Sequence, residues 1–287
     1  MGGTYQAGIQ LQLEVTNICD AACVFCPYPS MKRPKGRMDM DLFRRLIDEA
    51  ATLPLIDHIT FTGLGETLLD KDLMERIRYT RSVMPHIMLD MYSNGSQLTD
   101  AKMDELIALR LSILYVSLNA TRKEARQQIM YHHRPGYDDY DRVCAVLDYG
   151  IARYREKPVT KIMVKAIVSK DLMEVGEQEV FDARWNGRWD QGGNSFMHLE
   201  GNWAGAMYPV RVKPITPCSR ALGQIMVLQD GRVSLCCFDS EGGEILGDLN
   251  VNTIREVFNG PKALGIRTAH SEGRRSEIPL CAGCTAI

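Results

Sequence analysis

The sequence lacks the features that would place it in a membrane or on nucleic acid. No apolar run approaches the ~20 residues that a transmembrane helix requires. Lys and Arg number 34 against 36 Asp and Glu, so there is no basic excess of the kind that nucleic acid attracts. No basic segment followed by an apolar stretch opens the chain, so no secretory signal is visible. These absences predict a soluble cytoplasmic protein with no membrane or nucleic-acid partner.

Cysteine is the one residue type with an unusual count, since the chain holds nine. In a reducing compartment, clustered cysteines more often hold a metal than form disulfides. The cysteines form an early group and a late group, which are Cys19, Cys23 and Cys26, and Cys218, Cys236, Cys237, Cys281 and Cys284. Cys144 stands alone among apolar residues of a predicted helix and is expected in the core. Metal or cluster ligation is therefore expected for both groups.

The order of elements predicts an α/β fold. Alternating apolar and polar positions predict strands at 9–15, 56–62, 86–92, 112–118, 160–168 and 195–200. Apolar residues at helical spacing predict helices at 39–51, 70–83, 98–109, 121–130, 137–152 and 171–184. Strands that alternate with helices indicate a parallel sheet, open or curled into a partial barrel. Ligands collect at the carboxyl ends of such strands, where the first cysteines lie.

Past residue 205 the regular alternation of strands and helices stops and the predicted elements become short, so we expect two domains, 1–205 and 206–287. Residues 225–237 predict a hairpin with a two-residue type I′ turn at Asp230-Gly231, because that pair suits a left-handed backbone. Short helices at 252–258 and 261–269 and a Cys281-x-x-Cys284 tail follow. A segment of such short elements needs a cross-link or a bound metal to be stable, and four cysteines could provide the ligands.

Cys19, Cys23 and Cys26 have the spacing C-x3-C-x-φ-C, where φ is an aromatic residue, here Phe25. Three thiolates within this short span can bind three irons of a cubane and leave the fourth iron open, whereas a structural zinc site normally has four ligands. Zinc with a remote fourth ligand such as His58 is the alternative. The spacing, placed after a first strand, resembles the radical S-adenosylmethionine (SAM) enzymes, and the resemblance covers the whole chain.

The resemblance implies a partial (β/α)6 barrel that binds a [4Fe-4S] cluster and SAM, with Phe25 beside the cofactor. Cluster reduction would require an external one-electron donor such as flavodoxin or ferredoxin. The open iron binds the amino and carboxylate groups of SAM, and the reduced cluster releases a 5′-deoxyadenosyl radical that abstracts hydrogen from unactivated C–H bonds. The chain's task is then to position the substrate and exclude water.

The resemblance also implies contacts to SAM at the strand ends. Gly63-Leu64-Gly65-Glu66 looks like the family's Gly-Gly-Glu motif, which holds the methionine amino group, although Leu64 departs from it and a plain turn is the alternative. No adenine motif is recognisable in residues 163–167. The remaining polar residues that match family positions are Ser93 and Asn94 after strand three, Ser117 and Asn119 after strand four, and Arg134.

The roles expected for Ser117, Asn119 and Arg134 follow from their positions in the chain. Ser117 and Asn119 alternate onto one face of a strand and look like ribose and carboxylate ligands. Arg134 is similar to an arginine that pairs with the SAM carboxylate, and a solvated loop arginine is the alternative.

The second cysteine group resembles the opening of the SPASM and twitch extensions, because twelve residues separate Cys218 from Gly231 and four separate Gly231 from Cys236. Cys281 and Cys284 supply two more ligands. Four ligands indicate the shorter twitch form with one auxiliary [4Fe-4S] cluster, and a zinc ion is the physical alternative. Full ligation leaves no position for substrate, so electron transfer is the expected role.

Cys237 is the candidate catalytic residue. Neighbours in a strand point to opposite faces, so Cys236 as a ligand would turn Cys237 towards the barrel mouth. A thiol there could return a hydrogen atom to a substrate radical, as is thought for twitch-type radical SAM epimerases. A small buried apolar side chain is the other reading.

Aromatic and acidic residues near the sixth strand suit a polyhydroxylated or amino-bearing sugar, although core packing explains any single tryptophan as well. They are Trp185, Trp189, Asp190, Glu200 and Trp203.

The sequence favours an epimerase that inverts a carbinol carbon of a carbohydrate or aminoglycoside-type substrate. The alternatives are a dehydrogenase that oxidises a secondary alcohol of such a substrate, with the auxiliary cluster as electron acceptor, and a peptide-modifying enzyme. A non-catalytic iron–sulfur scaffold would leave Glu66, Ser93 and Ser117 without a role.

Overall fold

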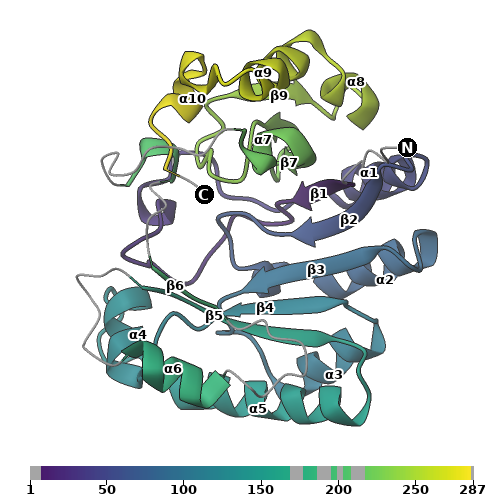
Figure 1. Ribbon diagram of the computed structural model, residues 1–287. Helices are drawn as coiled ribbons and strands as arrows, with labels where there is room; N and C mark the ends of the chain where they lie inside the picture. Colours follow the sequence, from purple (N-terminus) through teal and green to yellow (C-terminus); the bar gives the residue numbers. More distant parts are fainter. Residues whose placement is uncertain (1–7, 169–176, 186–194, 199–202, 208–216, 286–287) are drawn as a thin grey trace, which may run out of the picture.

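The computed structural model describes residues 8–168, 177–185, 195–198, 203–207 and 217–285, and one sheet joins its strands (Figure 1). The strands of the first part pair in parallel and in chain order. They are β1 (Ile9–Leu13), β2 (Ile56–Phe61), β3 (Met88–Ser93), β4 (Ile113–Ser117), β5 (Lys161–Val168) and β6 (Ser195–His198). The predicted α/β fold with a mostly parallel sheet is confirmed.

Helices connect these strands and cover one face of the sheet (Figure 1). They are α1 (Met40–Ala51), α2 (Leu73–Val83), α3 (Asp100–Ala108), α4 (Lys123–Met130), α5 (Tyr140–Glu156) and α6 (Glu177–Trp185). The predicted helix at 171–184 corresponds to α6, and its first predicted residues lie outside the described residues. Within the described residues, no helix is both long and apolar enough to cross a membrane.

The core lies between the helices and the sheet, because strand residues of one parity are apolar. Leu11, Leu13, Ile59 and Phe61 each have no exposed surface. Helix α1 buries an apolar stripe against them, and its first turn is capped by the Asp39 carboxylate, which accepts hydrogen bonds from two backbone N–H groups. The core also contains Cys144, as predicted.

The C-terminal part continues the same sheet. Strand β7 (Gln224–Val227) pairs in parallel with β1, and β8 (Arg232–Ser234) and β9 (Ile245–Asp248) follow in antiparallel order. The helices of this part gather beside this end of the sheet (Figure 1). They are α7 (Ser219–Gly223), α8 (Ile254–Phe258), α9 (Pro261–Ser271) and α10 (Pro279–Ala282). The hairpin therefore attaches the C-terminal cysteines directly to the first strand.

The hairpin turn differs from the prediction. Gly231 has φ +90°, but Asp230 is not among the residues with positive φ, so the turn is not type I′. Instead, the Gly231 N–H donates to the Leu228 carbonyl and the Leu228 N–H donates to Arg232, which is a type I turn followed by a left-handed glycine. The strand also ends at Ser234 rather than at Cys237.

Candidate active site

The first cysteine loop, residues 19–26, follows β1 and lies against the end of α4. The Ala22 and Val24 N–H groups donate to the carbonyls of Met130 and Ile129. The Tyr28 hydroxyl closes the loop, since it donates to the Cys19 carbonyl at 3.0 Å. Strand β1 and α4 together therefore set the shape of the loop.

The cysteines of this loop are half-buried, and protein atoms surround their thiols. Burial raises the pKa of Cys19 to about 12 and that of Cys26 to about 11. Burial also raises the pKa of Cys23, and the neighbouring Cys26 and Cys19 raise it further. Thiolates so close together and so poorly solvated need a positive centre to remain charged, and an iron cluster supplies one. The three cysteines fit the predicted cluster.

Asp20 connects this loop to the segment after β3. Its carboxylate accepts hydrogen bonds from Asn94 Nδ2 at 2.9 Å, Ser96 Oγ at 2.6 Å and Gln97 Nε2 at 3.1 Å. The Asn94 amide also lies 4.0 Å from Cys19 Sγ. The side chain of Asn94, expected to contact SAM, thus holds the cluster loop in place.

Glu66 lies at the centre of the expected SAM site and is almost fully buried. Its carboxylate accepts hydrogen bonds from Ser93 Oγ at 2.7 Å, the Asn94 N–H at 2.5 Å and the Leu68 N–H at 3.0 Å. Burial raises the pKa of Glu66 to about 7, and these hydrogen bonds oppose the rise. A carboxylate with spare lone pairs in so dry a place is suited to a cationic partner.

The turn before Glu66 requires a glycine. A Cβ added to Gly65 would lie 2.2 Å from the Thr16 carbonyl oxygen, a distance that no side chain tolerates. The Leu64 N–H donates to the Glu14 carboxylate at 3.1 Å. Residues 63–66 therefore pack directly on the segment that follows β1, with Gly63 beside the Glu14 side chain.

The remaining expected SAM contacts are only partly brought together. Ser117 is the last residue of β4, but the chain leaves the strand before Asn119, which has φ +56°. The prediction that the two side chains alternate onto one face is therefore wrong, and Asn119 Nδ2 approaches Met130 Sδ at 3.7 Å. Arg134 is exposed, and its guanidinium lies 3.9 Å from the centre of the Tyr137 ring.

Arg126 is a residue of this site that the sequence did not reveal. Its guanidinium donates to Asp139 at 2.6 and 3.0 Å and to the carbonyls of Asn94 and Leu118, both at 2.8 Å. It also lowers the pKa of Cys23, against the larger effect of burial. Arg126 thereby joins the segments after β3 and β4 to the helix on which the cluster loop lies. An arginine in a predicted surface helix carries no signal of burial.

The second cysteine group comes together at one small cavity. Cys218, Cys236, Cys281 and Cys284 all line it. Burial raises the pKa of Cys236, and the charges of Cys237, Cys281 and Cys284 raise it further. The buried Arg275 donates to the carbonyls of Cys281 at 3.2 Å and of Cys284 at 3.0 Å, which fixes the tail of the chain.

Zinc with a remote fourth ligand was the alternative for the first cysteine group. Ligands of one zinc ion converge within about 2.3 Å of a point. His58, the suggested fourth ligand, instead lies on β2, where its Nε2 is 2.8 Å from Asp90 Oδ2. In this structure His58 is therefore a partner of Asp90 on the sheet.

Cys236 and Cys237 lie past the end of β8, in a turn, so strand alternation does not separate them. Their surroundings nevertheless differ. Cys236 lies with the other three cysteines, whereas the Cys237 thiol interacts with the side chain of Arg220. Cys237 is also near Tyr92, because its charge raises the pKa of the Tyr92 hydroxyl, after the larger contributions of burial, Asp90 and Tyr115.

Of the predicted sugar-binding group, the structure describes Trp185 and Trp203, and these two have different surroundings. Trp185 is fully buried on α6 and packs in the core. Trp203 lies in a short turn, residues 203–205, where its Nε1 donates to the Phe25 carbonyl at 2.9 Å and its ring meets Phe238 edge-on. It thus bridges the two cysteine regions. Trp189, Asp190 and Glu200 lie outside the described residues.

The inner face of the sheet, turned away from α1–α5, is polar. It carries a hydrogen-bonded chain in which Gln10 Nε2 donates to Thr60 Oγ1 at 2.6 Å, and Thr60 and Asp90 both contact His58. On the same face, nearer the carboxyl ends of the strands, the rings of Tyr92 and Tyr115 stack with their centres 4.5 Å apart. A polar face beside the expected SAM contacts is suited to a polar substrate.

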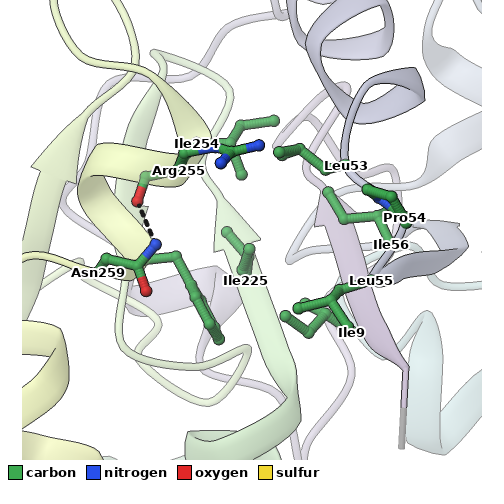
Figure 2. Close-up of a pocket in the computed structure, with 10 residues that line it drawn as sticks. Ile9, Leu53, Pro54, Leu55, Ile56, Ile225, Ile254, Arg255 and Asn259 are labelled. Carbon is green, nitrogen blue, oxygen red and sulfur yellow. Dashed lines mark hydrogen bonds between the residues drawn. The ribbon is translucent and has the colours of Figure 1, made fainter. Parts of the chain in front are cut away.

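A second, apolar cavity lies where β1, β2 and β7 begin, at the opposite end of the strands from the cysteines. It measures about 280 Å³, and Figure 2 shows Ile9, Leu55 and Ile225 around it. It brings no chemical group to the site described above.

Comparisons with known proteins agree with this geometry. Residues 13–164 match the model of the radical SAM superfamily, and residues 218–285 match an iron–sulfur cluster-binding domain, SPASM. A tungsten-containing aldehyde ferredoxin oxidoreductase cofactor-modifying protein of Pyrococcus furiosus is 28% identical over 56% of this chain. The match spans 44% of that relative's own length.

Two further similarities extend over nearly the whole chain. An S-adenosyl-L-methionine-dependent 2-deoxy-scyllo-inosamine dehydrogenase of Niallia circulans is 22% identical, over 96% of this chain and 92% of the relative. The crystal structure of BtrN in complex with AdoMet and 2-DOIA has a TM-score of 0.66 at 19% identity, over 98% and 94% of the two chains. This chain belongs to the radical SAM superfamily, and its cofactors are SAM and iron–sulfur clusters.

Proposed function

We propose that this enzyme oxidises a secondary alcohol of a polyhydroxylated ring, either an aminocyclitol or a sugar, to the ketone. The observation that carries the proposal is the match to a 2-deoxy-scyllo-inosamine dehydrogenase over more than nine-tenths of both chains. A match over part of the barrel would support the radical chemistry alone. A match over 96% of this chain extends into the C-terminal part, where we assign four cysteines to the auxiliary cluster, which would be the electron acceptor that an oxidation requires.

The inner face of the sheet supports the substrate class. It offers hydrogen-bonding groups on neighbouring strands, including Gln12, Thr60 and Asp90, and the stacked rings of Tyr92 and Tyr115. Oε1 of Gln12 and Oδ1 of Asp90 are buried without a hydrogen-bond partner. Buried polar atoms normally find partners, and the hydroxyl or amino groups of a ring would provide them.

The proposal assigns separate tasks to the two cysteine groups. Cys19, Cys23 and Cys26 hold the cluster that, with SAM bound, supplies the 5′-deoxyadenosyl radical. Glu66 accepts hydrogen bonds from the amino group of SAM. The chain positions the carbinol carbon and keeps water out. A flavodoxin or ferredoxin in the cytoplasm delivers the first electron.

Epimerisation is the second candidate, and one observation keeps it in view. The Cys237 thiol lies near Tyr92 of the inner face and interacts with Arg220, which also lines the cavity of the four other cysteines. A thiol so placed could return hydrogen to the far face of a substrate radical. The comparisons favour the dehydrogenase over the epimerase.

Anaerobic incubation with SAM, a reductant and a panel of cyclitols and sugars separates the two. The panel includes 2-deoxy-scyllo-inosamine, and the solvent is deuterated water. Mass spectrometry of a dehydrogenase reaction finds a ketone that has lost two hydrogens, whereas an epimerase gives an epimer that carries one deuterium. An epimer with solvent deuterium and no ketone would refute the proposal.

A further inference from the structure

Lys165 lies on the inner face of the sheet, beside the expected SAM contacts. It occupies the middle of β5, where the register pairs it with Ser117 on β4. The flanking residues Val164 and Ala166 are fully buried on the helix side, so Lys165 points the other way. Two residues earlier, the register aligns Met163 with Tyr115, and Tyr115 with Tyr92. Lys165 thus stands one step above the two stacked tyrosines, nearer the carboxyl ends of the strands.

The ammonium group of Lys165 is held by aromatic rings rather than by an acid. Its Nζ lies 4.4 Å from the centre of the Tyr115 ring, 5.1 Å from that of Tyr92, and 3.5 Å from the Tyr92 hydroxyl. In the described residues it has no carboxylate oxygen within salt-bridge distance. From the neighbouring strands, the titratable groups that face it are Asp90 and Tyr92 on β3 and Tyr115 on β4. Burial lowers the pKa of Lys165, and Asp90 partly opposes this.

Other bases of the described site are engaged or lie farther from the carboxyl ends of the strands. The Asp90 carboxylate has an unpartnered Oδ1, but the register aligns Asp90 through Ile113 with Lys161, four residues before Lys165. His58 contacts Asp90 and Thr60 near the start of β2, several residues from the strand ends. Glu66 accepts three hydrogen bonds and faces the expected ammonium of SAM. Lys165 combines a place beside Ser117 with a nitrogen that can lose its proton.

We infer that Lys165 contacts the carbinol hydroxyl of the substrate and accepts its proton during oxidation. The inference rests on the proposed function. Oxidation of a secondary alcohol to a ketone removes a hydrogen atom from carbon, a proton from oxygen and one electron. The hydrogen atom passes to the 5′-deoxyadenosyl radical and forms 5′-deoxyadenosine, the electron passes to the auxiliary cluster, and the proton passes to the neutral amine of Lys165.

The first test needs no substrate. The holoenzyme is labelled anaerobically with trace acetic anhydride over a range of pH, and peptide mass spectrometry gives the labelling rate of each lysine. Lys35 is the matched control, because its Nζ also lies over a tyrosine ring, 4.5 Å from the centre of Tyr28, but the residue is exposed. Labelling of Lys165 should reach its half-maximal rate at a lower pH than labelling of Lys35. Equal midpoints would overturn the inference.

The second test follows the products of Lys165→Met and Lys165→Arg. Each reaction uses a substrate that the wild-type enzyme oxidises, deuterated at the carbinol carbon. Both variants should still transfer deuterium to 5′-deoxyadenosine, but ketone per 5′-deoxyadenosine should fall by about a hundred-fold, because neither side chain accepts a proton. Lys161→Met is the control, since Lys161 lies four residues earlier on the same strand, and it should behave like the wild type.

The wild-type result separates the two proposals. With saturating SAM, the ratio of ketone to 5′-deoxyadenosine formed by the wild type should rise with pH, and this dependence should disappear in Lys165→Met. If the wild type forms ketone and Lys165→Met keeps the same ratio of ketone to 5′-deoxyadenosine, only the role of Lys165 is wrong. If the wild type forms no ketone from any member of the panel, the proposed function fails and this inference fails with it. Iron content and absorbance spectra check that the variants hold both clusters.

Discussion

The Arg33 guanidinium forms two parallel hydrogen bonds with the Glu14 carboxylate, at 2.8 and 2.9 Å. Both side chains are almost completely buried. Arg33 follows the first cysteine loop and Glu14 follows β1, while Nε of the same guanidinium donates to the carbonyl of Ser240, shortly after Cys237. One ion pair therefore fixes the first cysteine region against the turn that carries the second.

Arg33→Met should destabilise the protein strongly. It leaves the Glu14 carboxylate buried without its cation, a change that costs about 3–5 kcal/mol. For a chain of this size, that lowers the melting temperature by roughly 10 °C. Arg274→Met is the control, because Arg274 pairs with Glu272 and Glu277 on the exposed surface, and it should leave the melting temperature unchanged. Equal melting curves for the two variants would show that the buried pair has no structural role.

Glu66 should make SAM affinity depend on pH. Its pKa is raised to about 7 by burial, so the carboxyl is neutral below this pH and charged above it. Only the charged form accepts charge-assisted hydrogen bonds from the SAM ammonium. SAM affinity, measured by equilibrium binding to the oxidised holoenzyme, should be full above pH 7 and fall as the pH drops through 7.

The same binding assay applies to Glu66→Gln. The variant should bind SAM about ten- to a hundred-fold more weakly at pH 8, because it loses hydrogen bonds worth ~1.5–3 kcal/mol. Its affinity should change less between about pH 6 and 8 than that of the wild type, since the titrating carboxyl of residue 66 is gone. Wild-type affinity and wild-type pH dependence in Glu66→Gln would show that residues 63–66 form only a turn.

The cysteine groups should lose iron separately. Replacing Cys19, Cys23 and Cys26 together by alanine should remove roughly four of roughly eight irons and abolish 5′-deoxyadenosine formation. The remaining cluster should keep its absorbance, because its ligands lie in another part of the chain. Cys144→Ala, in the core, should retain all the iron. One cubane and one zinc in the intact protein would contradict the assignment of the auxiliary site.

The sequence predicted those parts of the fold and site that depend on local pattern. Alternation of polar and apolar residues identified the strands. Cysteine spacing identified the two cysteine groups, and within each group the structure places the cysteines near one another. Asp230-Gly231 located the hairpin, but the backbone of Asp230 took another turn type, which the sequence pair does not exclude. Local pattern also suggested that the strand reached Cys237, whereas it ends at Ser234.

Contacts between distant segments could not be predicted. The Glu14–Arg33 pair, the hydrogen bonds of Asp20 to the segment after β3, and the buried Arg126 all depend on the packed arrangement of several loops. All of these contacts are made by charged residues, which a prediction from one sequence would place on the surface. From the sequence alone, Lys165 is predicted only to be a polar position of a strand that alternates polar and apolar residues. Only the register with Ser117 and the stacked tyrosines gives it a place in the site.

Cys237→Ala separates the dehydrogenase from the epimerase. Four other cysteines line the auxiliary cavity, so both clusters should assemble without this thiol, and iron analysis checks this. For a dehydrogenase, the ketone should form at nearly the wild-type rate, because neither hydrogen abstraction nor electron transfer requires this thiol. For an epimerase, the variant should still cleave SAM but lose the deuterium-labelled epimer. Its substrate radical would then regain its hydrogen or lose an electron and form a ketone. We expect an unchanged ketone yield, and a wild-type epimer replaced by ketone in the variant would instead assign Cys237 as the hydrogen donor.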